Sequence, residues 1–266
     1  MGKAFADRWG VPVRAALRHR AALAYGSDVQ DVPWWGVISS AAAPVLLIGG
    51  WTVAASLQPH YDPVADTVSA LAAQGATDRW VMTLTFVVVG CCYIVTALAL
   101  RPAGTTGRLI LIAGALAGLL VAANPERPAD PYPIPHIIAA SAGLAGLVTW
   151  PAGACRRGSA VPWGLRPAVA TTAVAVLFAL VLWFGADLVL GAGQVGLAER
   201  VAGGAQAVWP LAVVLSCCWP REPAEDKNAV KARAAAAAPR TAPPMACQVV
   251  WSRIATRDQP SSPTSR

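Results

Sequence analysis

The sequence carries little charge for its length. Only 13% of its 266 residues are Asp, Glu, Lys or Arg, whereas a soluble globular domain carries about 25%. Apolar residues make up 56% of the chain. A composition this poor in charge and this rich in apolar residues excludes an ordinary water-soluble domain and indicates a chain that resides in a membrane.

The sequence also lacks the motifs of several protein classes. It has no H-E-x-x-H zinc motif, no nucleophile elbow and no glycine-rich phosphate loop. Its six cysteines include no C-x-x-C pair, and none lies in an expected extracytoplasmic loop, so no disulfide framework is indicated. The apolar runs hold almost no ionisable residues, which disfavours an ion-coupled carrier or an ion channel.

What the sequence does contain is six long apolar runs. A transmembrane helix needs about 20 largely apolar residues, and most of the runs reach that length. The third run is the shortest, and residues 105–107 can extend it if Arg108 reaches the interface. The pattern predicts an all-α fold, a polytopic bundle of six transmembrane helices at residues 33–57, 80–100, 108–123, 136–155, 167–189 and 201–218.

The basic residues are distributed unevenly about these runs. When the intervening segments are assigned alternately to two sides, 18 of the 21 Lys and Arg residues fall on one side, and only Arg79, Arg127 and Arg200 fall on the other. Lys and Arg are retained on the cytoplasmic face, so we expect both termini to be cytoplasmic in a multi-pass protein of the cell (plasma) membrane. This bias accounts for the net charge of +7, and we expect membrane lipids, not nucleic acid, as partners.

The chain divides into three parts. Residues 1–32 form a basic cytoplasmic segment, in which residues 11–24 suit either a helix on the membrane surface or a disordered arm. Residues 33–219 form the transmembrane domain, where small residues such as Gly114, Gly118 and Gly146 favour close packing within one bundle. The composition of residues 220–266 predicts a disordered cytoplasmic tail.

Polar residues of the expected extracytoplasmic loops are the candidate functional residues. Asp66 and Ser69 lie three apart in the first loop and would share one face of a helix, His136 opens the fourth run, and the third loop supplies Glu199 and Arg200. Carboxylates, a hydroxyl and an imidazole at one mouth of a bundle are the inventory of a divalent metal site. Each also has a structural explanation: an acid near a helix start, a serine bonded to its own helix, a histidine facing water, and a Glu–Arg pair.

Several short motifs carry a resemblance to a known family: Asp66-Thr-Val-Ser-Ala-Leu, Gly90, Arg108, Pro125, His136, Trp150-Pro151 and Gly196-Leu-Ala-Glu-Arg. Together they resemble the six-helix bacterial membrane proteins of domain-of-unknown-function family 998, particularly actinobacterial members, over about residues 36–218. The resemblance implies six spans and residence in a bacterial membrane. It supplies no activity, cofactor or catalytic residue.

Two functions stay open on the sequence. We expect a non-enzymatic binding or scaffolding protein, without a cofactor or resident metal, whose polar extracytoplasmic mouth is formed by Asp66, Ser69, His136, Glu199 and Arg200. The alternative is a metal-dependent intramembrane or interfacial hydrolase acting on a lipid-like substrate. It requires Asp66, His136 and Glu199 to meet within a few ångströms, because such ligand bonds are about 2.0–2.2 Å long. The sequence specifies neither a protein partner nor an oligomeric state.

Overall fold

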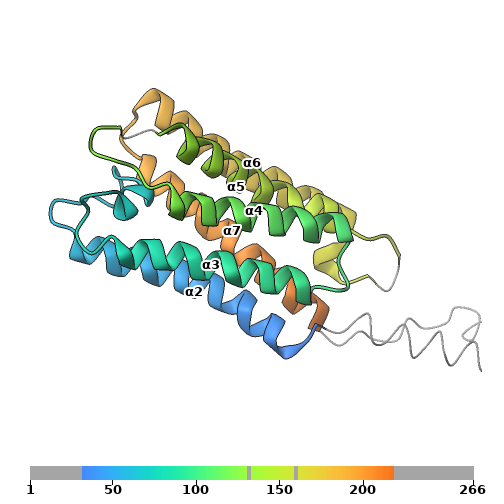
Figure 1. The fold of residues 1–266 in the computed structure, drawn as a ribbon. Helices are drawn as coiled ribbons and strands as arrows, with labels where there is room; N and C mark the ends of the chain where they lie inside the picture. The colour runs from blue at the N-terminus through green and yellow to red at the C-terminus, as the bar shows by residue number, and fades with distance from the viewer. Residues whose placement is uncertain (1–31, 131–132, 159–160, 219–266) are drawn as a thin grey trace, which may run out of the picture. The chain divides into compact units, whose positions relative to one another are not determined.

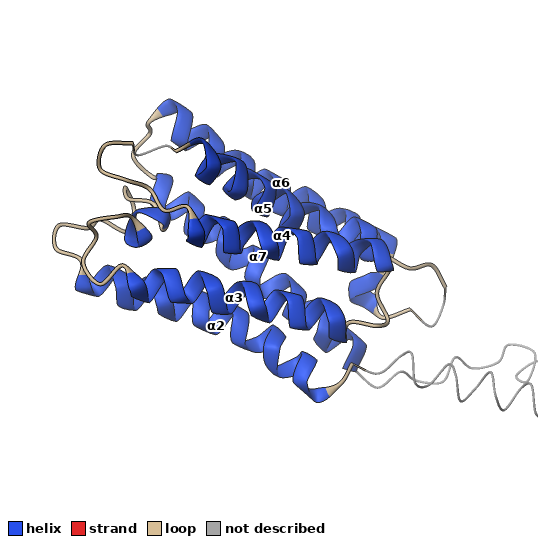
Figure 2. Ribbon diagram, viewed as in Figure 1, coloured by secondary structure: helices blue, strands red, loops and turns tan. Residues whose placement is uncertain are grey.

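Six long helices make up nearly all of the structure, a computed structural model that describes residues 32–130, 133–158 and 161–218 (Figures 1 and 2). They are α2 (Trp34–Leu57), α3 (Trp80–Ala99), α4 (Thr105–Ala123), α5 (Ile134–Ala154), α6 (Pro167–Leu190) and α7 (Val195–Cys218). Two short 3₁₀ helices, η1 (Ser69–Ala72) and η2 (Trp163–Leu165), lie in connections, and the described residues form no β-strand. The predicted all-α fold is confirmed. The N-terminal segment and the C-terminal tail lie outside the described residues.

All six helices are long and apolar enough to cross a membrane. Large apolar side chains such as Val45, Leu109 and Phe178 are exposed on the outside of the bundle, where lipid tails would solvate them. The chain is therefore a multi-pass integral membrane protein, as its composition predicts. Which of its faces is cytoplasmic stays a prediction.

The sixth helix begins about two turns earlier than the apolar run predicts, at Val195 instead of residue 201. Glu199 and Arg200 therefore belong to α7 and not to a loop. The expectation was wrong because hydropathy treats a charged pair as the end of a span, whereas these two side chains bind other parts of the protein. Leu197 and Arg200 donate hydrogen bonds to the loop between α2 and α3, which keeps this first part of α7 packed.

The helices pack in chain order, each against the next, and α7 packs against α2, so the six form a closed ring. Glycines allow the closest approaches. A Cβ on Gly146 of α5 would lie 2.8 Å from the Cα of Gly114 on α4, and a Cβ on Gly153 would lie 2.8 Å from the amide nitrogen of Gly107. The predicted small-residue packing inside the bundle is confirmed for Gly114, whereas Gly118 has open space beside it.

The described acidic residues are confined to one end of this ring. Every described Asp and Glu lies where α2, α4 and α6 end and α3, α5 and α7 begin, which we call the site end (left in Figure 1). Five described arginines lie at the opposite, far end: Arg101, Arg108, Arg156, Arg157 and Arg166. The site end therefore carries all the acidic side chains of the described residues.

Candidate functional site

A cavity of about 350 Å³ lies inside the helix ring. Its body is apolar, with side chains from α2 to α6 and Gly203 of α7: Leu47, Trp51, Phe86, Tyr93, Leu147, Phe184 and Leu188 are among the residues that line it. Its polar end lies at the site end and is formed by Thr67, Ser69, Glu126, His136 and Glu199. The volume is at the lower end of the range for small-molecule sites, roughly 300–1,000 Å³.

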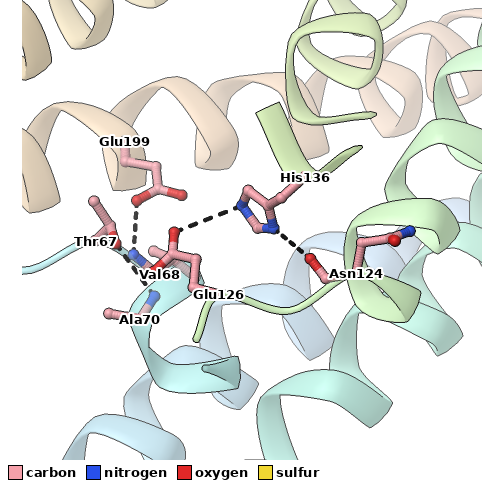
Figure 3. Close-up of polar contacts among 7 residues, drawn as sticks. All are labelled: Thr67, Val68, Ala70, Asn124, Glu126, His136 and Glu199. Atoms are coloured by element: carbon pink, nitrogen blue, oxygen red, sulfur yellow. Dashed lines mark hydrogen bonds and ion pairs between the residues drawn. The ribbon is translucent and has the colours of Figure 1, made fainter. Parts of the chain in front are cut away.

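Glu199 is held at this polar end by the first connecting loop, residues 58–79. It lies in the second turn of α7, and its Oε2 accepts a hydrogen bond of 2.6 Å from the backbone N–H of Val68 (Figure 3). The backbone N–H of Ser69 also donates to this carboxylate. Two convergent N–H donors fix the direction of this carboxyl group. The loop therefore places one oriented acid at the rim of the cavity.

Glu126 and His136 form a second acid–base element beside it. Nδ1 of His136 lies 2.9 Å from the carbonyl oxygen of Asn124, and because a carbonyl only accepts, Nδ1 carries a proton. Nε2 of the same buried ring lies 3.6 Å from Oε1 of Glu126. Figure 3 shows the Glu126 side chain between Glu199 and His136. Burial raises the pKa of Glu126 above its ordinary value, and the charge of His136 opposes this rise in pKa.

Arg200 is directed away from the cavity and into the first loop. Its Nη1 donates to the carbonyl oxygens of Pro63 at 2.8 Å, Gly196 at 3.0 Å and Asp66 at 3.2 Å. Its Nη2 donates to the Tyr61 hydroxyl, and the guanidinium carbon lies 5.5 Å from the centre of the Tyr61 ring. Arg200 is thus a structural clamp between the loop and α7, and its positive charge is used there.

Tyr61 completes this clamp from the loop side. Its hydroxyl donates to the carbonyl oxygens of Thr67 at 2.8 Å and Asp66 at 3.1 Å while it accepts from Arg200. Burial raises the pKa of Tyr61, and the hydrogen bond from Arg200 works against this rise in pKa. The neutral phenol therefore remains a donor that fixes the loop over the cavity.

Asp66 does not line the cavity. Its Oδ2 accepts a hydrogen bond of 2.8 Å from the backbone N–H of Asp62, and its own N–H bonds to the carbonyl of Asp62 in a single turn. The chain then leaves that turn before η1 begins at Ser69, so Asp66 and Ser69 do not share one helix face as predicted. The reason is tertiary: the carbonyls of this turn are bound by Arg200, which stops it from continuing as a helix.

The loop reaches α7 so closely because residue 196 is a glycine. A Cβ there would collide with the carbonyl oxygen of Asp66 and would lie 2.7 Å from that of Pro63. The next residue donates its backbone N–H to the carbonyl of Val64 at 3.1 Å. The position of Glu199 against Val68 depends on this backbone-to-backbone contact one turn earlier in α7.

The predicted site residues therefore divide into two groups. Ser69, His136 and Glu199 meet at the cavity, while Asp66 and Arg200 hold the loop above it. Glu126 was not among the predicted site residues, although it lies ten positions before His136 in a loop that returns to the same end. Within the described ranges, no group of three His, Cys, Asp or Glu side chains is placed to hold a metal ion.

Fold and cavity together define a class: an integral membrane protein of six helices with an internal, mainly apolar cavity that ends in a polar cluster. The family comparison is consistent with this class. The family model described as "Protein of unknown function (DUF998)" matches residues 41–216, and the chain belongs to that family. No curated protein and no solved structure matches the chain.

Proposed function

We propose that this protein binds an amphiphilic, lipid-like small molecule in the cavity, with the polar head of the ligand at the site end. The observation that carries the proposal is the composition of the cavity wall. Apolar side chains from α2 to α6 surround its body, and two carboxyl groups, an imidazole and hydroxyl groups form its end. Such a wall matches a molecule with one apolar part and one polar part.

The charges at the polar end favour a head that carries a positive charge and donates hydrogen bonds. Glu126 and Glu199 are acceptors when ionised, and His136 is the one basic side chain in the cavity wall. The nearest guanidinium, Arg200, is committed to loop carbonyls and to Tyr61. A primary ammonium group placed here would add charged donors to the two carboxylates, whereas an anionic head would face both of them.

The binding hypothesis is favoured over the metal-dependent hydrolase. That alternative needs Asp66 beside His136 and Glu199, but the Asp66 carboxylate bonds within its own turn and does not line the cavity. His136 is bound by a backbone carbonyl on one side and faces Glu126 on the other. These contacts suit a fixed polar wall, and we propose a non-enzymatic role.

We further propose that the site end faces outward from the cell membrane. The five arginines at the far end support this orientation, because basic residues are retained on the cytoplasmic side. Both termini would then be cytoplasmic, and the ligand-binding mouth would be extracytoplasmic.

Calorimetric titration of the full chain with dodecylamine, in an uncharged detergent, tests the proposal. Replacing Glu199 with Gln removes one charge-assisted hydrogen bond, worth about 1.5–3 kcal/mol, so the affinity should fall by about 10- to 100-fold. Asp130→Asn is the matched control, because Asp130 is an exposed acid of the same end outside the cavity wall. Dodecanol should bind more weakly than dodecylamine. Equal affinity of the wild type and Glu199→Gln, or equal affinity for the two ligands, would overturn the proposal.

A further inference from the structure

We propose that the ligand is a bilayer lipid with a primary amine in its head group, and that it reaches the cavity sideways, between α5 and α6, from the leaflet next to the site end. This inference rests on the proposed function and adds to it both a source and a route. A route through the membrane-facing wall distinguishes a lipid from an amphiphile that arrives from water.

Two helices contribute residues that line the cavity and are also exposed on the outside of the bundle. Ile137 of α5 and Leu188 of α6 are each 45% exposed, and both are part of the cavity wall. Ser141, one turn further along α5, also lines the cavity and is exposed. A side chain that belongs to both surfaces marks a place where the wall of the cavity is thin or open.

These residues lie at matching depths on antiparallel helices. Ile137 is three positions after the start of α5, and Leu188 is two positions before the end of α6. Ser141 and the half-buried Phe184 are each four positions deeper, about 6 Å further into the membrane at 1.5 Å per residue. The four side chains therefore frame an opening that extends over roughly one helical turn, which we call the portal.

Three other seams of the ring, α2–α3, α3–α4 and α4–α5, are closed by close helix contacts. Gly36 and Gly50 of α2 meet Ala99 and Thr85 of α3, and Gly90 of α3 meets Leu119 of α4, 2.8 Å from where its Cβ would be. Gly146 and Gly114 close the seam between α4 and α5 in the same way. No described glycine makes such a contact at the α5–α6, α6–α7 or α7–α2 seams, and among these the exposed cavity residues lie on α5 and α6. The α5–α6 seam is the one where cavity residues reach the lipid-facing surface.

The size of the cavity fits this route. Its 350 Å³ corresponds to roughly a dozen water molecules at about 30 Å³ each, which is less than a two-chain phospholipid occupies. A lipid can place its amine and the upper part of one chain inside only if the remainder stays in the bilayer. The portal provides the gap through which the molecule would extend, and Glu126 and Glu199 lie at the depth of the lipid head groups.

The experiment uses the full chain reconstituted in phosphatidylglycerol vesicles with a photoactivatable lipid. Phosphatidylethanolamine with a diazirine in one acyl chain is the probe, and phosphatidylglycerol with the same chain is the comparison. After illumination, mass spectrometry quantifies label on the peptides that contain Tyr93 and Leu147 in the cavity body. We expect the amine probe to label these peptides at least about tenfold more than the comparison, as one charge-assisted hydrogen bond implies.

Bulky substitutions then test the route. Ser141→Trp and Ile137→Trp should each reduce labelling of the cavity peptides by about tenfold or more, because an indole fills the portal. Ala142→Trp is the matched control, since Ala142 is the next residue, is exposed and does not line the cavity. Thermal unfolding of all three variants establishes that they fold. If Ser141→Trp does not fold, Ile137→Trp still tests the route.

The outcomes separate this inference from the proposed function. Undiminished labelling in both portal variants would overturn lateral access, while the binding function would stand. Equal labelling by the two probes would overturn the choice of an amine head. If neither probe labels the cavity but dodecylamine still binds, a bilayer lipid is not the ligand. If neither probe labels the cavity and dodecylamine does not bind, the proposed function fails as well.

Discussion

Replacing Gly196 with alanine perturbs the contact that places the first loop above the cavity. The new methyl group would meet only backbone atoms: the carbonyl oxygen of Asp66, the carbonyl carbon of Asp66 at 2.9 Å and the carbonyl oxygen of Pro63 at 2.7 Å. Backbone atoms cannot rotate away as a flexible side chain does. The loop must therefore move as a unit, and the hydrogen bonds that Arg200 donates to these same carbonyls must lengthen.

The magnitude follows from two opposing effects. Insertion of a methyl group into a closely packed site destabilises by about 1–3 kcal/mol, whereas replacing a helical glycine with alanine stabilises by about 0.5–1 kcal/mol. We expect a net destabilisation of about 1–2 kcal/mol in the free energy of unfolding. Displacement of the loop also moves the Val68 N–H away from Glu199, so the affinity for dodecylamine should fall in parallel.

The matched control is Gly185→Ala in α6, where the added methyl has no atom within 4 Å. This variant should be as stable as the wild type or gain up to about 1 kcal/mol, so the two variants should differ by about 2 kcal/mol. For a chain of this size that corresponds to a difference of about 4–8 °C in unfolding temperature in detergent. Equal unfolding temperatures for Gly196→Ala and Gly185→Ala would refute the contact between loop and helix.

Three further predictions follow from the same contacts. Burial raises the pKa of Glu126 above its ordinary 4.5. The protonated carboxyl group therefore contributes fully to the free energy of unfolding below pH 4.5, and this contribution is lost as the pH rises through the folded-state pKa. Dodecylamine affinity should conversely fall as pH is lowered through that raised pKa, and calorimetry of Glu126→Gln should show a smaller fall, because Glu199 remains in the cavity wall. Arg200→Lys cannot keep the four hydrogen bonds of the guanidinium group, so thermal unfolding should show a loss of about 1–3 kcal/mol in stability. Replacement of the exposed Arg127 with Lys should change the stability by no more than about 0.5 kcal/mol. Similar losses in the two variants would contradict the clamp. Gly146→Ala should destabilise the α4–α5 contact by about 1–3 kcal/mol, while Gly118→Ala, with open space beside it, should not; equal stabilities would disprove this packing.

The sequence predicts the architecture well because the requirement for crossing a bilayer concerns the length and hydropathy of a continuous stretch of sequence. Any stretch of about 20 apolar residues must satisfy its backbone internally and forms a helix, so the number and order of the spans follow directly. The boundary of α7 was wrong because Glu199 and Arg200 are polar residues with partners far away in the chain. Hydropathy contains no information on a partner such as Val68, which lies 131 positions earlier.

The candidate site could be predicted only in part for a similar reason. Ser69, His136 and Glu199 are correctly expected at one end of the bundle, because alternating spans return their loops to the same side. Whether a side chain points into a cavity or into its own loop depends on tertiary contacts, so the sequence could not show that Asp66 and Arg200 bind the loop instead of lining the cavity. Glu126 was missed as a site residue because a lone loop carboxylate has no motif that distinguishes it from a solvated one.

A structure of the protein determined with dodecylamine, in uncharged detergent, would show directly whether the cavity binds an amphiphilic amine through Glu126 and Glu199. We expect an elongated ligand inside the helix ring. Its nitrogen should lie within hydrogen-bond distance of the carboxylates of Glu126 and Glu199, and its chain should be directed toward Tyr93. A cavity that stays without ligand at saturating dodecylamine, or a ligand whose nitrogen lies away from both carboxylates, would contradict this expectation.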